Sequence, residues 1–205
     1  MNSSTTEHEK FWSGNFGTTY IDRNPIDFEL PARLALFCKI LSSTGPVNSC
    51  IEFGANVGNN LRALIRLIPS LKCTAVEINN EAVSVLKQWG CADVIHQSLF
   101  DFSSEKKFNL TFVSGVLIHL EPSSLPAAYD QLYTLSDKYI CMIEYYNPSF
   151  VEVEYRGHSG KLYKRDFAGE IMEKFPDLTL VDYGFVYRRD PSFPLDDLTW
   201  FLFKK

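Results

Sequence analysis

The fold of this chain is decided by the stretch Ile51-Glu52-Phe53-Gly54-Ala55-Asn56-Val57-Gly58-Asn59-Asn60. An apolar segment, 47–53, runs through a turn with two glycines into a segment whose apolar residues recur at helical spacing. Glycine lets the backbone approach a ligand at the carboxyl end of a strand, and the first turn of a helix offers unpaired N–H groups there. The stretch therefore predicts a strand, a ligand-binding turn and a helix in an α/β protein.

The same alternation extends along most of the chain. Five helices are predicted, over 27–42, 59–68, 80–89, 122–136 and 166–175. Seven strands are predicted, over 47–53, 73–78, 93–96, 110–114, 139–145, 178–187 and 198–204. Alternation of this kind indicates a doubly wound, Rossmann-like, mostly parallel sheet that is covered on both faces. No helix separates the last two strands, so we expect the last strand to be antiparallel.

The whole chain, 1–205, is expected to be one domain. Within it, 1–26 is interpreted as an arm or lid, because the aromatic and glycine-rich part from 11 to 24 lacks the pattern of a regular element. The segment 146–166 is interpreted as an insertion on the substrate side of the sheet.

Composition excludes several classes of protein. A net charge of −5 argues against a nucleic-acid partner. No apolar run is long enough for a membrane span or a signal peptide, and the five cysteines form no C-x-x-C pair, so we expect a cytoplasmic protein. The four histidines lack metal-ligand spacing, so no metal is expected.

Two carboxylates point to a nucleoside-containing cofactor. Glu77 ends the second predicted strand, where an acidic residue accepts hydrogen bonds from ribose hydroxyls. Glu52 precedes the turn and can reach an amino group of the cofactor or order the loop. The dinucleotide fingerprint is G-x-G-x-x-G, but Asn56 stands at its middle position and the third glycine is absent. This departure disfavours a pyrophosphate-containing cofactor.

The pattern E-x-G-x-N-x-G resembles motif I of the class I methyltransferases, which implies S-adenosylmethionine as the cofactor. Asn56 departs from the usual glycine, and Asn109 replaces the usual acidic residue before the fourth strand. Segments 97–99 and 112–120 are similar to those with which this class contacts the adenine and the methionine portion. The expected cofactor-binding residues are Tyr20, Arg23, Glu52, Gly54, Asn56, Gly58, Asn59, Glu77, Ile78, Gln97, Ser98, Leu99, Gly115 and Val116.

A narrower resemblance covers nearly the whole chain. Its motifs are Phe11-Trp12-x-Gly14-x-Phe16-Gly17-x-x-Tyr20-Ile21-x-Arg23-Asn24, Gly115-Val116-Leu117-Ile118-His119, Glu144-Tyr145-Tyr146-Asn147-Pro148, Tyr155-Arg156-Gly157 and Lys164-Arg165-Asp166-Phe167. Together they are similar to the methylases associated with pseudaminic acid biosynthesis. The resemblance implies a methyltransferase that acts on a small polar, anionic acceptor linked to a nonulosonic sugar.

Acceptor-side residues are expected after the fourth and fifth strands. His119 is a candidate general base, and Tyr146 is a second catalytic candidate. Asn-Pro after the fifth strand does not match the N-P-P-Y motif of adenine methylases, which follows the fourth strand, so a nucleobase substrate is rejected. Substrate-binding candidates are Asn147 and the basic cluster Arg156, His158, Lys164 and Arg165.

Two residues of the arm, Tyr20 and Arg23, are assigned to the cofactor. Arg23 could pair with the methionine carboxylate, while Trp12 and Phe16 would exclude water. Two other functions stay open: a nicotinamide-dependent sugar oxidoreductase, and a non-catalytic partner that binds the cofactor within a biosynthetic complex. The sequence leaves the oligomeric state open.

Overall fold

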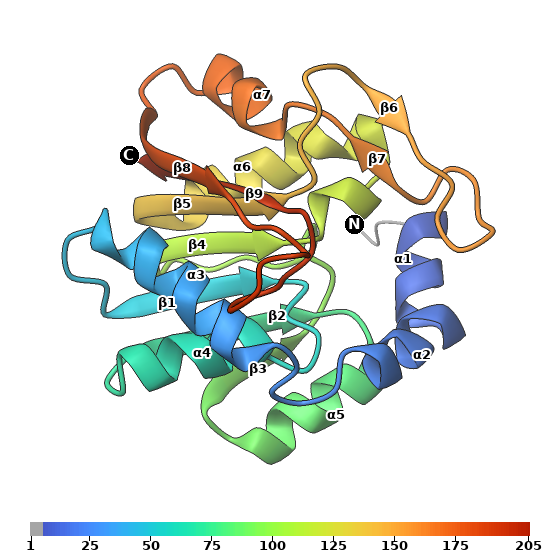
Figure 1. Cartoon of the computed structure of the whole chain (residues 1–205), viewed down its shortest axis with the longest axis horizontal. Helices are drawn as coiled ribbons and strands as arrows, with labels where there is room; N and C mark the ends of the chain where they lie inside the picture. Colours follow the sequence, from blue (N-terminus) through green and yellow to red (C-terminus); the bar gives the residue numbers. More distant parts are fainter. Residues whose placement is uncertain (1–5) are drawn as a thin grey trace.

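The structure is a computed structural model that describes residues 6–205. Its main feature is a seven-stranded sheet in the order β3-β2-β1-β4-β5-β9-β8 (Figure 1). The strands are β1 Ser49–Phe53, β2 Lys72–Glu77, β3 Ala92–His96, β4 Phe108–Ser114, β5 Ser136–Glu144, β8 Thr179–Phe185 and β9 Thr199–Lys204. Neighbouring strands from β3 to β5 are parallel, whereas β9 lies antiparallel between β5 and β8. The predicted doubly wound fold, with its last strand antiparallel, is confirmed.

The helices cover both faces of the sheet. They are α1 Glu7–Ser13, α2 Asn15–Arg23, α3 Leu30–Ser42, α4 Asn59–Leu67, α5 Asn80–Trp89, α6 Leu125–Leu135 and α7 Phe167–Lys174. Helices α3 and α4, with Leu86 of α5, pack in one apolar core. Helices α6 and α7 pack in the second core on the other face. The two cores hold the ends of the parallel strands rigidly in place.

Several predicted boundaries shift. The first predicted helix begins at Leu30 and not at residue 27, because Asp27 and Glu29 adopt positive φ angles of 60° and 53°. Asn79, not Asn80, caps α5. The helix predicted over 122–136 consists of a 3-10 turn, Pro122–Ser124, followed by α6. A second 3-10 turn, Leu117–His119, follows β4.

The interpretation of 11–24 as an irregular arm is wrong, because this segment forms the end of α1 and all of α2. A capping box explains the start of α1: Thr6 Oγ1 accepts from the Glu9 N–H, and the Glu9 carboxylate accepts from the Thr6 N–H. Both helices lie beyond the carboxyl ends of the parallel strands (Figure 1). The first five residues of the predicted arm lie outside the described range.

The segment from 146 to 166 contributes a second, two-stranded sheet at the same end of the molecule (Figure 1). Its antiparallel strands are β6 Val151–Glu152 and β7 Tyr163–Lys164. None of the helices within residues 6–205 has the length and apolar character that a membrane crossing requires.

Candidate functional site

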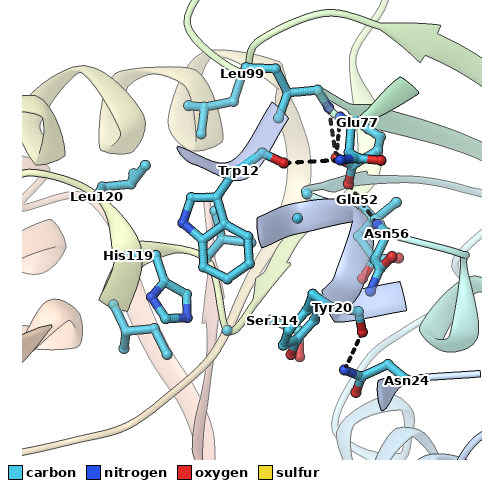
Figure 2. Close-up of a pocket in the computed structure, with 18 of the residues that line it drawn as sticks. Trp12, Tyr20, Asn24, Glu52, Asn56, Glu77, Leu99, Ser114, His119 and Leu120 are labelled. Atoms are coloured by element: carbon cyan, nitrogen blue, oxygen red, sulfur yellow. Dashed lines mark hydrogen bonds between the residues drawn. The ribbon is translucent and has the colours of Figure 1, made fainter. Parts of the chain in front are cut away.

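A cavity of about 480 Å³ opens between the carboxyl ends of β1, β2, β4 and β5 and the helices α1 and α2. Its size is typical of a site for a small molecule. Figure 2 shows its wall. Fifteen of the predicted cofactor-binding, catalytic and substrate-binding residues line it, namely Tyr20, Arg23, Glu52, Gly54, Asn56, Asn59, Glu77, Ile78, Gln97, Ser98, Leu99, Gly115, Val116, His119 and Arg156.

Gly58 was expected to bind the cofactor but does not line the cavity. It adopts a φ of +81°. A Cβ at this position would lie 2.7 Å from Leu86 Cδ2 of α5. Its glycine is therefore required by helix packing. Gly54 differs, because it lines the cavity and a Cβ there would meet Val116 Cγ2 at 2.6 Å.

Glu77 ends β2 with its carboxylate held by three backbone N–H groups. Its Oε2 accepts from Asn56 at 2.7 Å, and its Oε1 accepts from Ile78 at 2.8 Å and from Asn79 at 2.7 Å. Burial raises the pKa of Glu77, whereas the three N–H donors lower it. Asn56 adopts a left-handed conformation with a φ of +48°, and its N–H donates to this carboxylate. The strand end thus presents a fixed acceptor to the cavity.

Glu52, on β1, is the second carboxylate of the cavity. Its Oε1 accepts from Asn60 Nδ2 at 2.7 Å, and the Asn60 side-chain oxygen accepts from Arg33 Nη1 at 2.5 Å. Its Oε2 has no hydrogen-bond partner. Burial raises the pKa of Glu52 to about 8, even though the Asn60 hydrogen bond opposes the shift. An ionised Glu52 therefore needs a further donor or cation.

The unpartnered polar atoms of the protein gather at this cavity. Within residues 6–205, five buried side-chain atoms lack a hydrogen-bond partner, namely His8 Nδ1, Trp12 Nε1, Arg23 Nε, Arg23 Nη2 and Glu52 Oε2. All four residues line the cavity. The Arg23 guanidinium lies 5.1 Å from the Phe16 ring centre and 5.3 Å from that of Tyr20, so cation–π contacts hold it without satisfying its N–H groups. Buried groups of this kind usually pair with a ligand or with water.

His119 lies on the opposite wall from Glu77. The Glu144 carboxylate fixes the turn before it by accepting from the Val116, Leu117 and Ile118 N–H groups. His119 Nδ1 lies 2.6 Å from the carbonyl oxygen of Lys161. Because a carbonyl only accepts, Nδ1 carries the proton and Nε2 keeps its lone pair. Burial lowers the pKa of His119 to about 4, so the ring is neutral near pH 7.

Trp12 places an aromatic wall beside His119. The Trp12 ring centre lies 4.5 Å from that of His119 and 5.5 Å from that of Tyr20. Tyr155 also contacts His119, with 4.9 Å between ring centres and the two rings tilted. Figure 2 shows the Trp12 side chain between His119 and the side of the cavity that holds Glu77. The helical arm therefore brings the indole ring of Trp12 against the imidazole of His119.

The remaining acceptor-side residues lie outside the cavity wall. Tyr146 is exposed and packs 6.0 Å from the Phe201 ring. Asn147 Nδ2 donates to the Ser149 carbonyl, and His158 contacts the edges of the Phe11 and Phe16 rings. Of the predicted basic cluster, only Arg156 lines the cavity.

Two members of that cluster have local partners instead. Lys164 Nζ lies 4.7 Å from the Tyr145 ring centre. Arg165 Nε forms an ion pair with Glu170 at 2.5 Å. Neither residue lines the cavity, although Tyr145 does.

Comparison with solved structures places this geometry in a known fold. The chain is similar to the 1,6-didemethyltoxoflavin-N1-methyltransferase of Burkholderia thailandensis, solved with 1,6-didemethyltoxoflavin and S-adenosylhomocysteine, with a TM-score of 0.75 and 14% identity over 100% of this chain and 92% of that one. It is also similar to magnesium protoporphyrin IX methyltransferase of Synechocystis PCC 6803, solved with S-adenosylmethionine, with a TM-score of 0.70 and 12% identity over 100% of both chains. A methyltransferase from Clostridium acetobutylicum gives a TM-score of 0.64 at 12% identity over 92% of this chain and 97% of that one. No family profile and no curated protein sequence matches the chain.

This is the class I methyltransferase fold. Within residues 6–205, no group of three or more His, Cys, Asp or Glu side chains is arranged to hold a metal ion. In this fold the cavity lies where the parallel strands end, on both sides of β1, as expected for a doubly wound sheet.

Sequence reasoning did not single out several residues of the cavity. Arg33 reaches it from α3, and Asn79 from the start of α5. Asp196, in the loop before β9, lines it and accepts a hydrogen bond from Tyr145. No local pattern marks Asp196, because its approach depends on the path of the loop from 186 to 198. The capping box at Thr6 and Glu9 was the one overlooked local pattern that predicts α1.

Proposed function

We propose that the protein is an S-adenosylmethionine-dependent methyltransferase. The supporting observation is that three polar groups line one cavity: the Glu77 carboxylate, held in place by backbone N–H groups, and the Glu52 Oε2 atom and the Arg23 guanidinium, which both lack hydrogen-bond partners. Their chemistry fits the ribose hydroxyls, the ammonium and the carboxylate of this cofactor, in that order. A dinucleotide cofactor has no amino acid group, so it would offer no ammonium to Glu52 and no carboxylate to Arg23. The fold comparison supports the same proposal.

Each residue then has a definite role toward the cofactor. Glu77 would accept from the ribose hydroxyls, Glu52 would hold the ammonium, and Arg23 would bind the carboxylate in a bidentate manner. Ile78 and segment 97–99 would contact the adenine. Gly115 leaves room for the methionine portion, since a Cβ there would meet nothing within 4 Å. When bound, the cofactor supplies an electrophilic methyl group on a sulfonium.

On the acceptor side, Trp12 and His119 present a complementary pair of groups. The Trp12 indole N–H is a donor without a partner, and the neutral His119 offers Nε2 as an acceptor of a hydrogen bond or a proton. A hydroxyl group satisfies both, because it donates and accepts at the same oxygen. His119 would thus orient the acceptor hydroxyl and take up its proton as the methyl group is transferred.

The finer assignment of the acceptor rests on the resemblance to the pseudaminic acid-associated methylases. A nonulosonic sugar offers hydroxyl groups for Trp12 and His119 and a carboxylate for Arg156, which lines the cavity from the β6–β7 hairpin. Tyr146, Asn147, His158, Lys164 and Arg165 are proposed only as residues around the entrance, since they stand outside the wall. We therefore propose a hydroxyl of such a sugar as the methylated group.

Two measurements test these proposals separately. S-adenosylmethionine should raise the melting temperature of the purified protein, and the absence of a shift at millimolar cofactor would refute the function. The acceptor is tested with labelled cofactor in extracts of cells that make or lack nonulosonic acids. A labelled product found equally in both extracts would exclude the sugar but leave the methyltransferase.

A further inference from the structure

Asn79 uses every polar group of its backbone and side chain at a junction between the sheet and the N-terminal helices. Its Oδ1 accepts from the Glu81 and Ala82 N–H groups at 3.1 and 3.2 Å and so caps α5. Its backbone N–H donates to Glu77 Oε1 at 2.7 Å. The side chain is buried. These contacts account for its oxygen and its backbone, and leave the amide nitrogen to be explained.

The amide nitrogen points to the break between α1 and α2. Asn79 Nδ2 donates to the Trp12 carbonyl at 3.1 Å, and lies 3.5 Å from the Gly14 carbonyl and 3.3 Å from Thr18 Oγ1. Carbonyls at the end of a helix have no partner within the helix. The dashed line from the Trp12 carbonyl in Figure 2 marks the first of these bonds.

Gly17 makes this approach possible. A Cβ at Gly17 would lie 1.8 Å from the Trp12 carbonyl oxygen and 2.9 Å from Asn79 Nδ2. Helix α2 thus packs directly on the end of α1 and on the Asn79 amide. The same contacts fix the Trp12 backbone, from which the indole extends to His119 at 4.5 Å between ring centres.

The helical arm depends on such tertiary contacts. Helices α1 and α2 have 7 and 9 residues. Helices this short are marginal in water on their own. Other attachments are aromatic packing around Phe16 and the hydrogen bond from His8 Nε2 to the Gly160 carbonyl. Among the described contacts, those of Asn79 join the arm to the strand end that carries Glu77.

We propose that Asn79 is a positioning residue that connects the ribose-binding carboxylate to the arm and so holds Trp12 in the site. The proposal rests on the proposed function for the role of Glu77. Cofactor bound at Glu77 fixes the 77–79 turn, the turn presents the Asn79 amide to the arm, and the arm closes over the cavity. Cofactor binding and ordering of α1 and α2 are then coupled through one amide group.

The substitution Asn79→Asp separates this role from capping. Aspartate caps a helix as well as asparagine but has no N–H to donate. The variant Asn79→Ser also caps and adds no charge beside Glu77. The control is Asp166→Asn at the start of α7, where the Asp166 carboxylate accepts from the Gly169 N–H. This control variant replaces a capping aspartate with asparagine, which is the opposite of Asn79→Asp, at a helix that lies outside the cavity.

Hydrogen exchange followed by mass spectrometry measures the arm directly. S-adenosylhomocysteine should slow exchange in residues 7–23 and 56–80 of the wild type and of Asp166→Asn. In both Asn79 variants, residues 7–23 should exchange at least tenfold faster than in the wild type, with and without ligand, because the hydrogen bonds from the Asn79 side-chain N–H groups to the arm are lost. Protection of residues 56–80 by the ligand should remain.

Each outcome decides the proposal. If residues 7–23 exchange hydrogen at the wild-type rate in both Asn79 variants, the proposal is overturned. Exchange that rises equally in residues 80–89 would also overturn it, since loss of the cap would then explain the effect. If the ligand protects no segment of the wild type, the proposed function fails, and the ligand-free comparison still tests the contact of Asn79 with the arm.

Discussion

The turn around Gly54 and the segment from 146 to 166 were both expected to carry functional residues, yet they differ in outcome. Every residue predicted in the turn and at the end of β2 lines the cavity, except Gly58. Of six residues predicted from 146 to 166, only Arg156 does. The turn joins a buried strand to a buried helix in a few residues, so its geometry is local. The other segment adds a hairpin whose side chains find partners of their own. In this comparison, residue chemistry predicted the cavity wall more completely where the connection between elements is short.

The largest effect that would sharpen this contrast is expected at Glu77. Glu77→Gln should lower affinity for S-adenosylhomocysteine by at least a hundredfold, because hydrogen bonds from ribose to a charged group each contribute about 1.5–3 kcal/mol. Calorimetry measures the loss. Glu81→Gln, at an exposed glutamate of α5, is the control and should bind normally. Equal binding by both variants would remove Glu77 from the site.

A loss of similar size, in kcat and not in affinity, is expected on substitution of His119. His119→Gln should lower kcat by about a hundredfold, the lower end of the usual contribution of a general base. His158→Gln, outside the cavity, serves as the control. Because burial holds the pKa of His119 at about 4, the wild-type ring is deprotonated from about pH 5.5 upward. An acid limb of kcat/KM near pH 6.5 that disappears in His119→Gln would contradict this assignment.

Arg23 tests whether the arm contributes to cofactor binding. Arg23→Met should weaken S-adenosylhomocysteine binding by about thirtyfold, since a charge-assisted pair with the carboxylate is lost. The matched variant is Arg66→Met on α4, whose guanidinium pairs with the exposed carboxylate of Asp27. An equal affinity for Arg23→Met and the wild type would show that the arm covers the cavity without binding the cofactor.

Glu52 should produce a pH dependence of binding. Burial raises the pKa of Glu52 to about 8, so the free site is protonated near pH 7 and must release that proton to hold an ammonium. The affinity for S-adenosylhomocysteine should therefore rise by up to about tenfold per pH unit from about pH 6 to pH 8 and then level off. The free energy of unfolding of the free protein should fall over the same window, because the unfolded chain binds fewer protons there.

The control for this pH effect is Glu52→Gln, which removes the titrating group. Its affinity for S-adenosylhomocysteine should show a flatter pH profile than the wild type. Identical slopes in the two proteins, measured by calorimetry in several buffers, would assign the proton to another group.

The smallest effects are expected outside the cavity wall. Tyr146→Phe and Arg165→Gln should each change kcat/KM by less than about threefold, because exposed contacts and surface ion pairs contribute little. Steady-state kinetics with the identified acceptor tests this expectation. A loss comparable with that of His119→Gln would break the contrast between the two regions and place the β6–β7 hairpin in the active site.

The sequence by itself determined the alternation of the main-sheet strands with the helices from residue 27 onward, the antiparallel last strand and the positions of Glu52, Gly54 and Glu77. These features follow from periodicity, caps and short connections, which act over a few residues. Only the tertiary structure decided that Asn15–Arg23 is helical, that Trp12 meets His119, and that Asp196 and Arg33 reach the cavity. Only it showed that Gly58 serves helix packing. Such contacts join segments far apart in the chain, and no local preference fixes which side chains meet there.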